Sequence, residues 1–343
     1  MSGKHIVILK NDAVGDLVHS LKAINNIVKD PDIKRVTIYL SKLSKKFNFL
    51  FDNPKIKFKV INYNLSFIEK IKLFLFILFN KIFKIYILAP KNFYYFLPLF
   101  FFNTKFYAVC VDNLNGYKRP SPFLRKFLHK YVINDRSAIF KRKSTSDIQN
   151  ELTYNANTKN NKFVINVDLS SNLKKYLPSD YIYFHAKKKI LNELGWGIYE
   201  LKLLFNEFLK YSENIVITKD VEFDENTKIF KQNFNSFDFK SMIFINKSQP
   251  VIFFDNIDGK ELYSTITHSK KIIAFHGMMT NLGSINKHAV LDLFHCKINN
   301  WNDYRNYRNS FYEFKPKYQG YDFIIPSKNI NKTLRKIEYS LKK

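Results

Sequence analysis

Glycine, cysteine and acidic residues are all scarce in this sequence of 343 residues. It contains nine glycines and two cysteines, Cys110 and Cys296. Both cysteines lie in apolar, strand-like stretches and lack the spacing of a metal site. We therefore expect buried thiols in a reducing cytosol, with neither a disulfide framework nor a metal centre.

Long apolar runs are absent as well. The first one, Ile6–Leu9, is too short for the core of a secretory signal. The longest uncharged stretches, Leu73–Asn80 and Asn92–Thr104, fall short of the ~20 residues that cross a bilayer. These lengths predict a cytoplasmic protein without a membrane-spanning helix.

Several catalytic signatures are missing too. The sequence has no GxGxxG, GxxxxGK[ST], GxSxG or HExxH motif, which argues against dinucleotide enzymes, P-loop proteins, serine hydrolases and zincins. Asp30-Pro31-Asp32 has the form of a metal-binding Asp-x-Asp, but it follows a helical pattern rather than a strand. We interpret it as a turn.

Positive charge is abundant, with 56 lysines and arginines against 29 acidic residues and a net charge of +27. Such a field attracts nucleic acid, anionic lipid, or phosphorylated and carboxylated substrates. Residues 118–143 are the most basic segment, which is either a solvated face or an attractor for an acidic acceptor or an anionic leaflet. The neighbouring aromatic region 65–102 forms either core or a membrane-docking surface.

Apolar runs and helical patterns alternate along most of the chain, which predicts parallel, doubly wound sheets. The predicted strands are Ile6–Leu9, Lys34–Leu40, Lys55–Asn62, Lys84–Ala89, Lys105–Val111, Tyr181–His185, Asn214–Thr218, Pro250–Asp255, Lys271–Phe275 and Ala289–Phe294. The predicted helices lie near 17–28, 41–51, 65–82, 199–211, 259–268, 278–285 and 328–342, and residues 92–102 form a helix or hairpin arm. Residues 112–150 look irregular, and the pattern in 220–248 favours no element.

Asp16 lies where the first predicted strand turns into the first predicted helix. A carboxylate at a helix N-terminus is favoured by the free amides and the helix dipole, so a helix cap is one interpretation. This position also lies beyond the carboxyl end of a strand, where open α/β sheets bind ligands.

Residues 8–24 resemble the N-terminal motif of the heptosyltransferase-like glycosyltransferases, family 9. The matching string reads ILK, then VGDLVHSLKAI, and Lys22 replaces the usual proline. The resemblance implies the glycosyltransferase B fold, in which two doubly wound Rossmann-like domains face each other across a cleft. It implies that Asp16 is the catalytic base, with Asn11, Gly15 and His19 beside the substrate.

Residues 258–280 resemble the nucleotide-sugar segment of the same family, in which a turn at a helix start reads Asp-Thr-Gly-x-x-His. Only Gly277 is kept, because Phe275, His276 and Thr280 replace the other three residues. The backbone amides of such a turn suit a diphosphate. The resemblance implies donor binding by His276, Gly277, Met278, Met279, Thr280 and Asn281. Alternatively, His276 is a strand-end histidine bonded to backbone, and the methionines pack in the core.

The segment around His185 resembles the motif that follows the interdomain linker in this family. The usual phosphate-binding lysine, two residues before Trp196, is replaced by Leu194. A flexible ammonium tolerates displacement, so we expect His185, Lys187 and Lys188 to contribute to the donor site. The alternative is a solvated basic loop.

Together these patterns predict an acceptor-binding domain over 1–165, a nucleotide-sugar-binding domain over 172–326 and a closing helix over 327–343. The resemblance implies an inverting, metal-independent transferase without a cofactor, which moves a heptose-like sugar in bacterial lipopolysaccharide biosynthesis. We expect as partners a nucleotide sugar, an acidic glycan or glycolipid acceptor, and the anionic inner leaflet at the cytoplasmic face, but no nucleic acid. Two alternatives stay open: a nucleic-acid-binding basic protein, and a family member that has lost activity.

Overall fold

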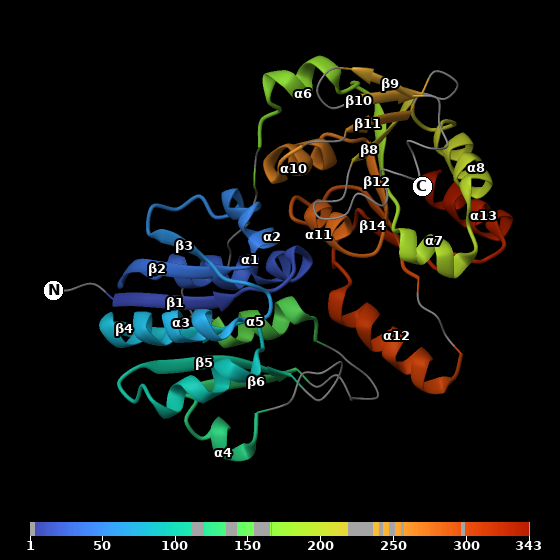
Figure 1. Ribbon diagram of the computed structural model, residues 1–343. Helices are drawn as coiled ribbons and strands as arrows, with labels where there is room; N and C mark the ends of the chain where they lie inside the picture. The colour runs from blue at the N-terminus through green and yellow to red at the C-terminus, as the bar shows by residue number, and fades with distance from the viewer. Residues whose placement is uncertain are drawn as a thin grey trace. The chain divides into compact units, whose positions relative to one another are not determined.

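The chain divides into two compact units. The computed structural model describes residues 4–111, 120–134, 143–153, 165, 167–218, 236–239, 243–246, 251–254, 257–295 and 299–342. Unit 1 comprises residues 1–162 and 298–315, and unit 2 comprises residues 163–297 and 316–343 (Figure 1). Cys296, residues 155–164 and most of 220–248 lie outside the described residues, as do several arginines and lysines of 118–143.

Unit 1 is built on a parallel six-stranded sheet with the order β3-β2-β1-β4-β5-β6. Its strands are β1 (Lys4–Lys10), β2 (Ile33–Leu40), β3 (Ile56–Val60), β4 (Ile82–Ile87), β5 (Lys105–Val111) and β6 (Lys130–Asn134). The chain runs outward from β1 in one direction and then returns to continue from β1 in the other. This order creates a topological switch point between β1 and β4, where the loops that leave the two strands run to opposite sides of the sheet.

Both faces of the unit 1 sheet are covered by helices. Val7 and Leu9 of β1 lie in an apolar cluster with Leu73 and Ile77 of α3 (Phe67–Phe79). Ile6 and Ile8 are equally buried on the opposite face, because successive strand residues point to opposite sides. The other helices are α1 (Val14–Val28), α2 (Lys42–Lys45), α4 (Pro122–Arg125) and α5 (Thr145–Thr153), with 3-10 turns η1 (Asn48–Leu50) and η2 (Asn92–Leu99).

Residues 298–315 return to unit 1, whereas the division expected from the sequence placed them in the second domain. They form helix α12 (Trp301–Phe314), which the sequence analysis did not predict. The buried carboxylate of Glu313 accepts hydrogen bonds from Asn134 at 2.8 Å and from Thr145 at 3.1 Å. These bonds tie α12 to β6 and α5 of the first unit.

Unit 2 contains an eight-stranded sheet with the order β14-β13-β12-β7-β8-β11-β10-β9. The six strands from β14 to β11 are parallel, and β10 and β9 continue the sheet in antiparallel fashion. The strands are β7 (Tyr181–His185), β8 (Asn214–Thr218), β9 (Ser236–Phe239), β10 (Ile243–Asn246), β11 (Val251–Phe254), β12 (Lys271–Phe275), β13 (Val290–Leu293) and β14 (Tyr321–Ile324). The corresponding switch point lies between β7 and β12.

Helices also cover both faces of the second sheet. Phe184 of β7 packs in one apolar cluster with Phe205 and Phe208 of α8 (Ile198–Phe208). On the other face, the Tyr181 hydroxyl donates to the Thr265 carbonyl of α10 (Gly259–Thr267) at 2.6 Å. The remaining helices are α6 (Ser171–Tyr176), α7 (Lys188–Leu194), α11 (Met278–Ser284) and α13 (Ile330–Leu341).

The predicted pair of doubly wound sheets is confirmed, and all ten predicted strands are present with bounds within two residues of the prediction. In 112–150, β6 and α5 form instead of irregular structure, and β14 was not predicted either. α3 begins at Phe67 because Ser66 and Glu69 form a reciprocal capping box. Among the residues that the structure describes, no helix has both the length and the apolar character to span a bilayer.

His5 on β1 makes unit 1 sensitive to acid. Its ring is buried beside the Thr37 hydroxyl at 2.9 Å, and burial, together with Arg35 and Lys59, lowers the pKa of His5 to about 4. Because the unfolded chain binds this proton more readily below pH 6.5, we expect His5 to remove about 2 kcal/mol of stability between pH 7.5 and pH 5. His5→Gln should reduce that loss in urea unfolding. An identical loss in both proteins would contradict the assignment.

Candidate functional site

The first candidate site lies at the switch point of the unit 1 sheet. The β1–α1 loop leaves the carboxyl end of β1 and contains Asn11, Asp12 and Ala13, and Asp16 follows in the first turn of α1. The loop after β4 brings Lys91 to the same edge, because β4 is the neighbour of β1 in the sheet. Open α/β sheets bind ligands at this kind of position.

The Asp16 carboxylate is half-buried and has no hydrogen-bond partner among the described residues. The N-cap of α1 is Ala13, so Asp16 is not the residue that caps the helix. The side chain extends from the first turn of α1, at the N-terminal end of the helix. A carboxylate of this kind is available to accept a proton from a bound hydroxyl group.

A buried ion pair supports the loop behind Asp16. The Lys10 ammonium donates to the Asp12 carboxylate at 2.6 Å, and both side chains are almost fully buried. Burial raises the pKa of Asp12 against the opposing effect of Lys10, and the negative charge of Asp16 raises it further. Burial also lowers the pKa of Lys91, against the opposing effects of Asp12 and Asp16. These four charges form one electrostatic cluster.

Hydrogen bonds hold the same loop rigidly. The Asn11 amide donates to the Asn62 carbonyl at 2.8 Å, and its carbonyl oxygen accepts from the Tyr94 hydroxyl at 2.8 Å. Ser41 and Ser44 both donate to the Asp12 carbonyl, at 2.9 and 2.7 Å. Asn11 is fully buried by these contacts, so its side chain serves as a support of the loop.

The second candidate site lies at the switch point of the unit 2 sheet. β7 and β12 are parallel neighbours, with His185 paired to Ala274, so the residues that follow them share one sheet edge. Lys187 follows β7 and donates its ammonium to the carbonyl of His276, which follows β12. The next residue, Gly277, has φ of 151°, a conformation available to glycine and rarely to other residues.

His276 is held by a buried carboxylate that the sequence analysis missed. Its Nδ1 lies 2.6 Å from the Asp292 carboxylate on β13, which also accepts from the Tyr321 hydroxyl at 2.7 Å. Asp292 is fully buried, and the His276 ring packs against Phe294 with centroids 4.4 Å apart. With Nδ1–H donated to Asp292, the orientation of the His276 ring is defined.

The other residues predicted for substrate binding fall into two groups. Partly exposed ones are Gly15, His19, Lys188 and Met278, whereas buried ones are His185, Met279, Thr280 and Asn281. Met279 is fully buried, as the core interpretation expects. The Thr280 hydroxyl accepts from the Gly277 amide at 3.1 Å, which occupies one amide of the expected phosphate cradle. The substrate roles of all eight residues stay predictions.

Sequence reasoning also missed Asp12 and Lys91 in unit 1 and Tyr321 in unit 2. Asp12 and Lys91 carry a recognisable signal, since each is a charged residue just beyond a buried strand. Asp292 and Tyr321 carry none, because they lie within strands and their relevance depends on strand order.

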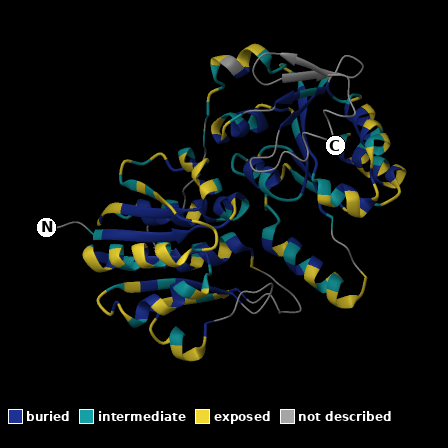
Figure 2. Cartoon of the chain, in the orientation of Figure 1, coloured by how far each residue is buried: buried dark blue, intermediate teal, exposed yellow. Residues whose placement is uncertain are grey.

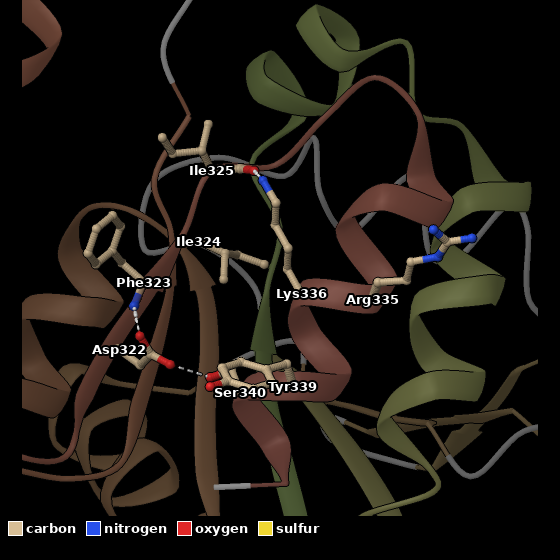
Figure 3. A pocket seen from close by; sticks show the side chains of 8 residues that line it. All are labelled: Asp322, Phe323, Ile324, Ile325, Arg335, Lys336, Tyr339 and Ser340. Atoms are coloured by element: carbon tan, nitrogen blue, oxygen red, sulfur yellow. Dashed lines mark hydrogen bonds between the residues drawn. The ribbon is translucent and has the colours of Figure 1, made fainter.

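No group of three or more metal-ligating His, Cys, Asp or Glu side chains gathers in the described parts of the chain. A separate pocket of about 490 Å³ lies between β14 and α13 (Figure 3). Lys336 on its wall donates to the Ile325 carbonyl at 3.0 Å, and Ser340 donates to Asp322 at 2.7 Å. This pocket shares no lining residue with either candidate site.

No protein-family profile and no curated protein matches the sequence. Solved structures match over nearly the whole chain. A glycosyltransferase family 9 protein from Veillonella parvula has a TM-score of 0.64 at 13% identity, covering 99% of this chain and 89% of that chain. The ADP-heptose lipopolysaccharide heptosyltransferase II of E. coli has a TM-score of 0.66 at 12% identity, covering 98% of both chains.

A second class of enzyme has the same architecture. UDP-GlcNAc 2-epimerase from Methanocaldococcus jannaschii has a TM-score of 0.56 at 13% identity, covering 99% of this chain and 93% of that chain. At such low identity these matches establish a common fold. The predicted glycosyltransferase B fold is therefore confirmed: this chain has the two-sheet architecture found in a family 9 glycosyltransferase, a heptosyltransferase and a nucleotide-sugar epimerase.

Proposed function

We propose that the protein is a glycosyltransferase that uses a nucleotide-sugar donor. The observation that carries the proposal is the pair of switch-point sites, one with an available carboxylate and one with a lysine, a histidine and a glycine of positive φ. The names of the similar structures support a nucleotide sugar, since they include an ADP-heptose transferase and a UDP-GlcNAc epimerase.

In the proposed reaction, Asp16 removes the proton of an acceptor hydroxyl while that oxygen attacks the anomeric carbon of the donor. The bond from the sugar to the nucleoside diphosphate breaks, and the configuration at the anomeric carbon inverts. Lys187 and the His276 ring, which Asp292 orients, stabilise the negative charge that develops on the departing diphosphate. In this scheme these two side chains do the work that a bound divalent metal ion does in metal-dependent transferases.

We further propose an acidic, lipid-linked saccharide as acceptor, in a bacterial lipopolysaccharide pathway at the cytoplasmic face of the inner membrane. The net charge of +27 supports an anionic acceptor, because a positive field raises its local concentration. The rate at low acceptor concentration should fall steeply with added salt. A rate independent of salt would argue against an acidic acceptor.

The proposal can be tested with a panel of nucleotide sugars. Release of nucleoside diphosphate that depends on an added acceptor glycan supports transfer. Conversion of the donor sugar to an epimer without an acceptor would instead assign the protein to the epimerase class. Absence of any nucleotide binding by calorimetry would favour a catalytically inactive protein or a nucleic-acid-binding protein, which direct RNA and DNA binding would distinguish.

Lys187 gives a sharper test of the donor site. We expect Lys187→Met to raise the Kd for the nucleoside diphosphate about tenfold, because an ammonium next to a phosphate is removed. Lys189→Met is the matched control, since Lys189 is exposed on the same segment and lies 4.0 Å from Glu193. Isothermal calorimetry measures both. Equal affinities for both variants would place the diphosphate elsewhere.

A further inference from the structure

One face of α3 is apolar and exposed. Six of its side chains are between 41% and 79% exposed, whereas only Leu73 and Ile77 of this helix are buried. At 100° per residue, the six exposed positions fall within an arc of about 120°, so they form one continuous stripe. The residues of this stripe are Phe67, Ile68, Ile71, Leu75, Leu78 and Phe79. Figure 2 shows the exposed colouring along α3.

The stripe continues onto the next element of unit 1. Phe74, which borders it, contacts the ring of Phe100 at a centroid distance of 5.6 Å, and Phe100 is itself largely exposed. The apolar surface therefore extends from α3 to the end of η2. Exposed apolar patches of this kind mark interaction sites.

The charge around the stripe is almost entirely positive. Between Ile33 and Val111 the sequence has 14 lysines and arginines against two acidic residues, Asp52 and Glu69. The Glu69 carboxylate accepts hydrogen bonds from the backbone amides of Asn62 and Ser66, at 2.7 and 2.8 Å, within the helix cap. Lys72 lies at the edge of the stripe, one turn from Ile68 and Leu75, and Lys81 follows the helix; both are exposed.

We propose that this surface binds an anionic lipid bilayer, with the stripe in the headgroup–acyl boundary and the lysines on lipid phosphates. A single apolar helix face bordered by lysines is the pattern of helices that lie in a membrane interface. The stripe itself carries no cation and is aliphatic at its centre, which suits acyl chains better than nucleic-acid bases. The strong positive charge opposes pairing with a second copy and favours an anionic partner.

The surface contains no residue of the two candidate sites, so it can be tested independently of the proposed reaction. In vesicle flotation, we expect the protein to bind phosphatidylcholine vesicles with about 30% phosphatidylglycerol much better than pure phosphatidylcholine vesicles. Phe67→Ser/Phe79→Ser should lower the partition coefficient at least about tenfold. Tyr199→Ser/Tyr339→Ser, which removes two largely exposed rings from unit 2, should leave the partition coefficient unchanged.

Lys72→Gln/Lys81→Gln should remove most of the preference for anionic vesicles while binding to neutral vesicles stays the same. Near-ultraviolet circular dichroism checks that each variant folds. Unchanged flotation of the phenylalanine variant, or equal flotation with neutral and anionic vesicles, would overturn the proposal. So would a dimer in sedimentation velocity that the phenylalanine variant abolishes, or RNA binding that depends on the same two rings.

Discussion

Replacing Asp16 by asparagine is expected to lower kcat for sugar transfer by about 10²- to 10⁴-fold, while the Kd for the nucleoside diphosphate changes less than about twofold. Asparagine keeps the shape of the side chain but cannot accept a proton from the acceptor hydroxyl. The loop around it should keep its structure, because Asn11, Ser41 and Ser44 hold it through bonds that do not involve the Asp16 side chain.

Asp52→Asn is the matched control for this measurement. Asp52 is an exposed carboxylate of the same unit, and its replacement removes the same charge from the field of unit 1. Turnover is measured as acceptor-dependent release of nucleoside diphosphate, and binding as calorimetric affinity. If Asp16→Asn turns over at the rate of Asp52→Asn, Asp16 is not the catalytic base.

Replacing Gly277 by alanine should weaken nucleoside diphosphate binding by at least about tenfold. A Cβ at this position collides with the Lys187 ammonium, and φ of 151° is a conformation that alanine rarely adopts. Such backbone strain costs on the order of 1–3 kcal/mol, and relieving it moves both the turn and the lysine. The Lys187–His276 contact should therefore be lost.

Gly195→Ala tests whether backbone strain alone could weaken nucleoside diphosphate binding. Gly195 also has a positive φ, 70°, at the C-cap of α7, but an added Cβ there contacts nothing within 4 Å. We expect Gly195→Ala to lower the melting temperature without changing the Kd for the nucleotide. Equal loss of affinity in both variants would show that stability, rather than the geometry of the turn, limits binding.

Much of the fold follows from short-range patterns. The apolar run before Asp16 and the helical spacing after it predict β1 and α1, and the same reasoning places β12 and α11 around Gly277. Helix α12 was missed because its buried residues include the polar Asn309 and Glu313, so its apolar face is weak in the sequence. β6 was missed because it lies in a basic segment and buries only Asn134, so no buried apolar face marks the strand.

The sequence by itself determined the strand–helix alternation, the two loops that carry Asp16 and Gly277, and the excess of positive charge. Only the tertiary structure decided that Asp292 holds His276, that Lys91 joins the charges around Asp16, and that Glu313 ties α12 to Asn134 across 179 positions of the chain. The physical reason is the separation along the chain of the residues that come into contact. Helical and strand periodicities record contacts between near neighbours, whereas these pairings depend on strand order and on which buried polar groups find a partner.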